Sequence, residues 1–144
     1  MGQYHYVINR TKKQFLHPHR LGDGLKLMEF VGSRDGTISA LALLLACSNG
    51  RGGGDFRGED PDGLVGSWAG DSIAIVGDYF RAEDMPDYPL DLDWKDHFED
   101  ISPRIRKVME GSGMFQMTRS WAFEDNPEDK GQGWRKSSTT QGFL

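Results

Sequence analysis

The chain has 144 residues, of which 37% are hydrophobic and 27% charged, and its formal net charge is −5. This length suits one domain with one core, while the modest apolar share and the 19 glycines indicate a large fraction of loop. The apolar run at 40–47 is far shorter than the roughly 20 residues of a membrane-spanning helix, and the alternating N-terminus lacks a secretory signal, so we expect a cytoplasmic protein.

The N-terminal residues predict a β-hairpin. Tyr4, Tyr6 and Ile8 alternate with other residues, and a turn at 11–13 leads into a second short strand at 14–16. After a glycine-rich break at 22–24, residues 25–30 could form a short helix or a strand, and we favour the helix.

Residues 37–48 predict the central helix of the fold. The run is rich in Ala and Leu on all sides, and Asp35 or Thr37 is placed to cap it. We therefore expect a buried helix that is covered on more than one side, by the sheet and by other elements or a second subunit. Cys47, the single cysteine, is expected to be a buried thiol of a reducing compartment.

A second hairpin is predicted around Gly70-Asp71, with strands at 64–69 and 72–76, because a glycine at the first turn position suits a type II′ turn. Farther along, Ser102 as N-cap, Pro103 at the first helical position and Gly111 just after the last turn indicate an amphipathic helix. Residues 114–123 predict a last strand.

Together these elements predict an α+β fold. We expect an antiparallel sheet built from two hairpins plus the C-terminal strand, packed on the buried central helix and the second, amphipathic helix. Residues 1–123 would form this single domain, and residues 124–144 a polar C-terminal tail in which Trp134 and Phe143 could dock.

Residues Glu83–Asp100, named the acidic segment below, concentrate the negative charge. They hold eight acidic residues and one lysine, a net charge of −7, and the rest of the chain is nearly balanced. Such a segment could steer a basic protein partner, or it could be a solvated loop. The predicted partner-binding residues are Asp87, Asp91, Asp93, Asp96, Trp134 and Phe143.

Residues 49–58 form a glycine-rich loop that sacrifices backbone entropy. Its amides could surround an anion, with arginines adding phosphate contacts, or the loop could be a connector. It lacks the P-loop motif and follows a helix, so no helix N-terminus points at a phosphate. The predicted ligand-binding residues are Arg51, Gly52, Gly53, Gly54, Asp55, Arg57, Trp68 and Asp71.

His17 and His19 are two residues apart and lie close in sequence to Asp23, so these three side chains are a candidate metal site. No spacing suggests a nucleophile with its base, and no cofactor is implied. The sequence shows no basic stripe, so we do not expect the protein to bind nucleic acid.

Three stretches, at 22–30, at 48–55 and at the Trp-Ala-Gly-Asp-Ser-Ile-Ala-Ile-Val-Gly-Asp-Tyr run of 68–79, resemble a family of small uncharacterised bacterial and phage proteins. The resemblance covers about residues 3–80. It implies a phage-type context, no assigned activity and no catalytic residues.

The sequence therefore supports two hypotheses. The first is a non-enzymatic binding protein that engages a protein partner through the acidic segment and the tail, and a homodimer is compatible with its apolar helix. The alternative is a small enzyme or sensor that binds a phosphorylated or nucleotide-like ligand at the glycine-rich loop.

Overall fold

The computed structural model describes residues 2–87 and 89–117. The elements in chain order are β1 His5–Asn9, β2 Gln14–Leu16, η1 Pro18–Leu21, α1 Leu27–Phe30, α2 Thr37–Leu45, β3 Ile73–Gly77, η2 Ala82–Asp84, η3 Trp94–Asp96, β4 Glu99–Asp100 and α3 Ser102–Ser112. The η elements are short 3₁₀ helices. The predicted α+β class is confirmed.

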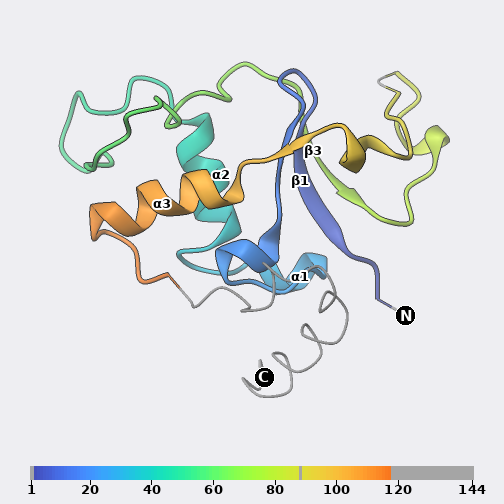
Figure 1. Cartoon of the computed structure of the whole chain (residues 1–144), viewed down its shortest axis with the longest axis horizontal. Coiled ribbons are helices and arrows are strands. Elements are labelled where there is room, and N and C mark those ends of the chain that lie inside the picture. Colours follow the sequence, from blue (N-terminus) through green and yellow to red (C-terminus); the bar gives the residue numbers. More distant parts are fainter. Residues whose placement is uncertain (1, 88, 118–144) are drawn as a thin grey trace.

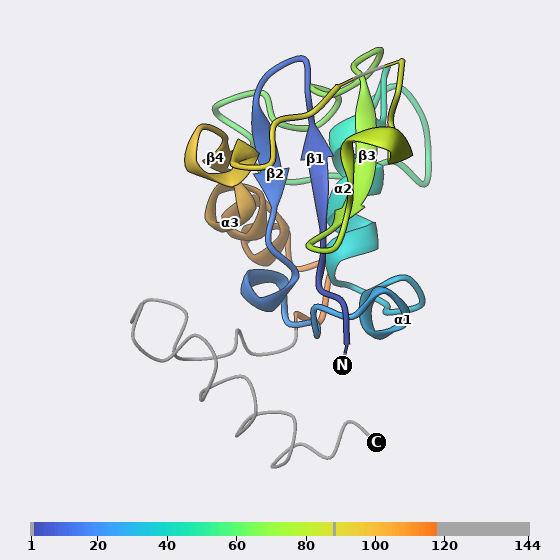
Figure 2. The same cartoon turned by 90° about the vertical axis from the view of Figure 1, so that its right-hand side faces the viewer.

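One four-stranded sheet has the order β3-β1-β2-β4 (Figure 2). β1 pairs antiparallel with β2 and with β3, whereas β4 runs parallel to β2. The prediction of a purely antiparallel sheet is therefore wrong, because the acidic segment supplies the strand β4 and the Glu99 N–H donates to the Lys13 carbonyl at 2.9 Å. Of the predicted last strand, residues 114–117 form no strand and residues 118–123 lie outside the described residues.

The predicted second hairpin is also wrong, because residues 64–69 form no strand. The N–H groups of Gly66 and Trp68 donate to the carbonyls of Leu43 and Leu44, at 2.9 and 2.8 Å. These carbonyls belong to the last turn of α2, where the carbonyls lack their usual donors from a following turn of helix. The segment therefore caps α2, and β3 pairs with β1 instead.

α2 is shorter and less enclosed than predicted. Its fully buried side chains lie on one stripe, whereas Leu45 is 38% exposed. Cys47 is exposed, which corrects the prediction of a buried thiol. The physical reason is that α2 ends at Leu45 and the backbone becomes extended at Ala46, so that Cys47 is no longer part of the helix.

α3 begins at Ser102 with a proline in its first turn, and it ends two residues later than predicted, at a Gly113 with a φ of 72°. This positive φ suits glycine, which ends helices in this way. The apolar side chains that α3 buries are Ile105, Val108 and Met109.

The sheet divides the described residues into three layers. Figure 1 shows α2 and α3 on one side of the strands and the acidic segment on the other. The helix-side core includes Val7, Leu16, Phe30, Ala40, Leu44, Trp68, Ile105 and Met109. The opposite core includes Tyr6, Ile8, Phe15, Leu25, Val76 and Trp94, with Phe80, Met85, Leu90 and Phe98 packed against it. Neighbouring residues of β1 thus serve different cores, as strand geometry requires.

Candidate functional site

Aromatic side chains fix the acidic segment on the sheet. Trp94 is 6% exposed, and its ring lies 5.3 Å from that of Phe15 and 5.8 Å from that of Tyr6, centroid to centroid. The Phe98 ring adds a further edge-on contact at 5.5 Å. Such edge-to-face pairs stabilise beyond the area that they bury. The segment is therefore held in place although little of it is regular secondary structure.

The predicted partner-binding carboxylates remain on the outside of this cover. Asp87, Asp91, Asp93 and Asp96 are all exposed. Asp93 lies 3.1 Å from the ring of His97, and both side chains are more than half exposed. At the far end, by contrast, Asp100 is partly buried and lies 3.0 Å from Arg20. The segment thus packs Trp94 and Phe98 against the sheet and presents most of its charge to solvent.

A cavity of about 430 Å³ lies between the sheet and the acidic segment. Tyr6, Asp78, Trp94 and Lys95 are among the residues that line it, together with Leu92, which is 74% exposed. The Lys95 ammonium donates to the Tyr6 hydroxyl at 2.9 Å and lies 4.3 Å from the centre of the tyrosine ring. This contact gives the acidic segment a second attachment to β1.

Two buried titratable groups near Lys95, Tyr6 and His19, have pKa values that lie farther from neutral pH than usual. Burial, with the nearby charges of Asp78 and Asp100, raises the pKa of Tyr6 to about 12. Burial, with the charge of Lys95, lowers the pKa of His19 to about 3. A general base works best with a pKa near the operating pH. Both groups are moved away from that range.

The glycine-rich loop folds around its own carboxylate. One oxygen of Asp55, Oδ2, accepts hydrogen bonds from the N–H groups of Gly50, Arg51 and Gly52 at 2.8, 2.9 and 3.1 Å. The bonds from Gly52 and Gly50 lower the pKa of Asp55 the most. Asn49 closes the loop through two hydrogen bonds with the backbone of Phe56, whose ring is buried in the helix-side core. Three N–H groups of the loop therefore converge on a carboxylate of the loop itself.

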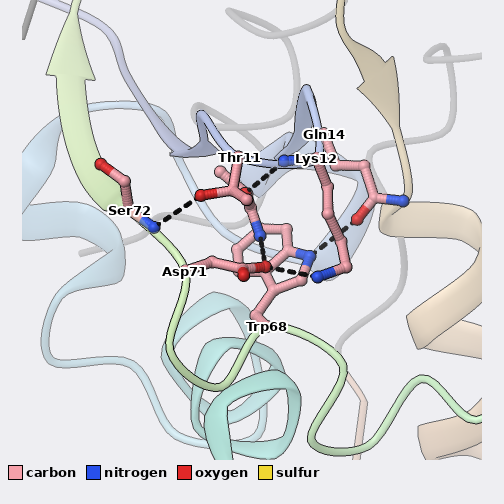
Figure 3. Close-up of polar contacts among 7 residues, drawn as sticks. Thr11, Lys12, Gln14, Trp68, Asp71 and Ser72 are labelled. Atoms are coloured by element: carbon pink, nitrogen blue, oxygen red, sulfur yellow. Dashed lines mark hydrogen bonds and ion pairs between the residues drawn. The ribbon is translucent and has the colours of Figure 1, made fainter.

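Trp68 and Asp71, predicted to share a ligand site with this loop, lie in a different network (Figure 3). The buried Trp68 donates its indole N–H to Gln14 at 2.8 Å. Asp71 accepts from the Asn9 amide at 2.8 Å and from the Lys12 ammonium at 2.6 Å, and these bonds lower its pKa. Both side chains tie the segment before β3 to the β1–β2 turn.

A second cavity, of about 780 Å³, lies between residues 58–64 and α3. Its lining mixes charges, since Arg104 and Lys107 face Glu59 and Asp62. Arg104 lies 3.7 Å from Asp62 and 3.2 Å from Glu99, which also belongs to the acidic segment. Arg104 is thus paired with two carboxylates.

The predicted metal ligands are only partly brought together. The rings of His17 and His19 lie 5.5 Å apart, centroid to centroid. Asp23 instead accepts the Thr37 N–H at 2.7 Å, at the start of α2, and burial raises its pKa. Within residues 2–87 and 89–117, no three His, Cys, Asp or Glu side chains are grouped so that they could hold a metal ion. The three-ligand prediction therefore lacks its third ligand.

Sequence reasoning missed Tyr6 and Lys95 as parts of one site. They are 89 residues apart in the sequence, and neither belongs to a motif. The aromatic residues within the acidic segment were the available signal, because a purely solvated loop has no need of Trp94 and Phe98.

The predicted tail residues Trp134 and Phe143 lie outside the described residues. Among the helices that the structure does describe, none has the length and apolar character to cross a membrane. When the chain is compared with known proteins, no family model, no curated protein and no solved structure matches it.

Proposed function

We propose that the protein is a non-enzymatic binding protein and that its acidic segment is the surface that a basic protein partner recognises. The observation that carries this proposal is that different residues of the segment attach it to the sheet and present its charge. Trp94 and Phe98 pack on the sheet, while Asp87, Asp91, Asp93 and Asp96 remain exposed.

This arrangement favours binding for a thermodynamic reason. Ordering a flexible loop on association costs free energy, and a segment that is already held by its aromatic side chains avoids much of that cost. Its concentrated negative charge would also accelerate the encounter with a basic partner at low salt. The exposed Leu92 adds an apolar contact among the carboxylates.

The alternative, a phosphorylated or nucleotide-like ligand at the glycine-rich loop, receives less support. A phosphate would have to displace Asp55 from three backbone N–H groups. Trp68 and Asp71 lie in the separate network at the β1–β2 turn, so they do not help the loop to hold a ligand.

The test is affinity capture from a lysate of the source cells with three forms of the full chain. These are the wild type, the double variant Asp87→Asn/Asp91→Asn, and the matched control Glu59→Gln/Asp62→Asn, which removes two exposed carboxylates near α3. A partner retained by the wild type and the control but lost by the first variant supports the proposal. Equal retention by all three forms contradicts it.

A further inference from the structure

β3 is one of the two outer strands of the sheet, and within residues 2–87 and 89–117 it pairs only with β1. β1 covers its other edge in a register that pairs Val7 with Ile75 (Figure 2). At the two ends of this ladder, the Arg10 N–H donates to the Ser72 carbonyl at 2.9 Å and the Asp78 N–H donates to the Tyr4 carbonyl at 2.8 Å. In an antiparallel ladder, residue pairs joined by backbone hydrogen bonds alternate with pairs that are not joined. The backbone N–H and C=O groups of residues 72, 74, 76 and 78 therefore point toward β1.

It follows that the N–H and C=O groups of Ile73 and Ile75 point away from β1. Among the described residues, none forms a hydrogen bond with these four groups. The carbonyl of Gly77, which points the same way, accepts from the Phe80 N–H at 3.1 Å. The available edge is therefore the stretch from Ile73 to Ile75.

The sequence of this edge lacks two of the features that protect exposed strands, a charged residue and a proline. β3 has the sequence Ile-Ala-Ile-Val-Gly, without a charge or a proline, and Ile75 is 39% exposed. Unprotected apolar edges of this kind accept an added strand. The main question is which strand the edge accepts.

The charge around the edge selects the occupant. Figure 2 shows the turn η2 in front of β3, and its residues Glu83 and Asp84 are exposed, as is Asp87 beyond it. A second copy would bring another segment of the same net charge against this one, and like charges repel. An extended segment that carries Lys or Arg has the complementary charge.

The two faces of the sheet add a pattern. Side chains on one face of an added strand would lie beside the acidic segment. Side chains on its other face would lie beside Ile75, whose side chain is on the helix side of the sheet, like that of Ile73. Side chains of a strand alternate between faces. A segment that alternates basic and apolar residues therefore matches both sides.

We propose that the partner binds as an added β-strand on the edge of β3, through an extended segment in which basic residues alternate with apolar ones. This inference rests on the proposed function and specifies how the same surface is used. The backbone of Ile73 and Ile75 supplies the hydrogen bonds, and the acidic segment selects the charge.

The experiment uses the full chain and short capped peptides. The probe is a nine-residue peptide that alternates lysine with valine, and its control alternates glutamate with valine. We expect the lysine peptide to bind and to slow hydrogen exchange at the amides of Ile73 and Ile75. The glutamate peptide should bind at least about tenfold more weakly, because its charge is repelled.

Two N-methylated forms of the lysine peptide test the backbone contact without changing the protein. One is methylated on its lysine amides and the other on its valine amides, so only one of them loses the N–H groups that face β3. We expect that form to bind at least about tenfold more weakly than the other, because it loses backbone hydrogen bonds. Equal affinities would overturn the inference.

The remaining outcomes separate the two proposals. If Asp87→Asn/Asp91→Asn weakens binding of the lysine peptide while both methylated forms bind equally, the acidic surface stands and the added strand is overturned. If the lysine peptide binds no better than the glutamate peptide, both proposals fail. Protection of the Ile73 and Ile75 amides before peptide is added would show that the edge is already covered and would also overturn the inference.

Discussion

The two faces of the sheet are covered by different means. On one face, the regular helices α2 and α3 bury mainly aliphatic side chains around Trp68. On the other face, a largely irregular segment with a net charge of −7 is held by the rings of Trp94, Phe98 and Tyr6. The comparison shows that a segment without helical or strand periodicity can still be fixed when a few large rings supply the buried area. It also separates the roles: the helix face stabilises the domain, and the aromatic face presents charge.

The largest effect should follow from removing the centre of the helix face. Trp68→Ala deletes a side chain with no exposed surface and its hydrogen bond with Gln14, and should cost about 4 kcal/mol of unfolding free energy. Because domains are stable by only roughly 5–15 kcal/mol, much of the fold should be lost. Urea unfolding followed by circular dichroism measures this, with Trp68→Phe as the milder control. A change below about 1 kcal/mol would contradict the central role of Trp68.

The matching change on the aromatic face should be smaller and local. Trp94→Ala should cost about 3 kcal/mol, because the acidic segment can detach while the helix-side core stays packed. Hydrogen exchange should then accelerate in the acidic segment and remain slow in α2 and α3. Trp94→Phe should retain most of the protection. Equal acceleration in both regions would show that the two faces unfold as one unit.

Acid should weaken the fold through His19. Its pKa is about 3 in the folded protein and about 6.5 in an unfolded chain, so between these values the unfolded state binds the proton and unfolding is favoured as the pH falls. The slope from this group is at most about 1.4 kcal/mol per pH unit. Unfolding free energies at pH 7 and pH 4.5 should differ less in His19→Gln than in the wild type. Identical pH dependence in the two proteins would exclude this role.

The smallest effect is expected at the glycine-rich loop, because the hydrogen bonds that Asp55 accepts come from the loop's own backbone. Asp55→Ala should speed hydrogen exchange at Gly50, Arg51 and Gly52 and leave the urea midpoint almost unchanged. The control Asp62→Ala should change neither the exchange at these amides nor the urea midpoint. Inorganic phosphate should shift these amide resonances in Asp55→Ala only. Shifts in the wild type would revive the ligand hypothesis.

Local signals predicted the parts of the fold that local interactions decide. The alternation at residues 4–16 corresponds to β1 and β2, and α3 begins at Ser102, one residue before the start predicted from Pro103. The prediction failed at residues 64–69 because two of their N–H groups form hydrogen bonds with carbonyls of α2, which are distant in the sequence. Gly66 donates to α2, and a Cβ on it would lie 2.6 Å from the Ala46 carbonyl oxygen, so this glycine is required by a contact that sequence does not reveal.

The site was predictable to a similar degree. Exposure of Asp91 and its neighbours follows from the cost of burying charge, which needs no knowledge of the fold. The packing of Trp94 on Tyr6 depends on how the acidic segment crosses the sheet. The unpaired edge of β3 was likewise hidden, because the prediction paired this strand with residues 64–69.

The exposed thiol just after α2 offers a practical handle. Cys47 is the single cysteine of the chain and closely follows α2, which lies across the sheet from the acidic segment (Figure 1). A maleimide dye or a biotin linker attached there would tether the protein to a sensor chip with its carboxylates turned toward the flowing solution. The labelled protein would thereby report binding at the charged face without blocking it.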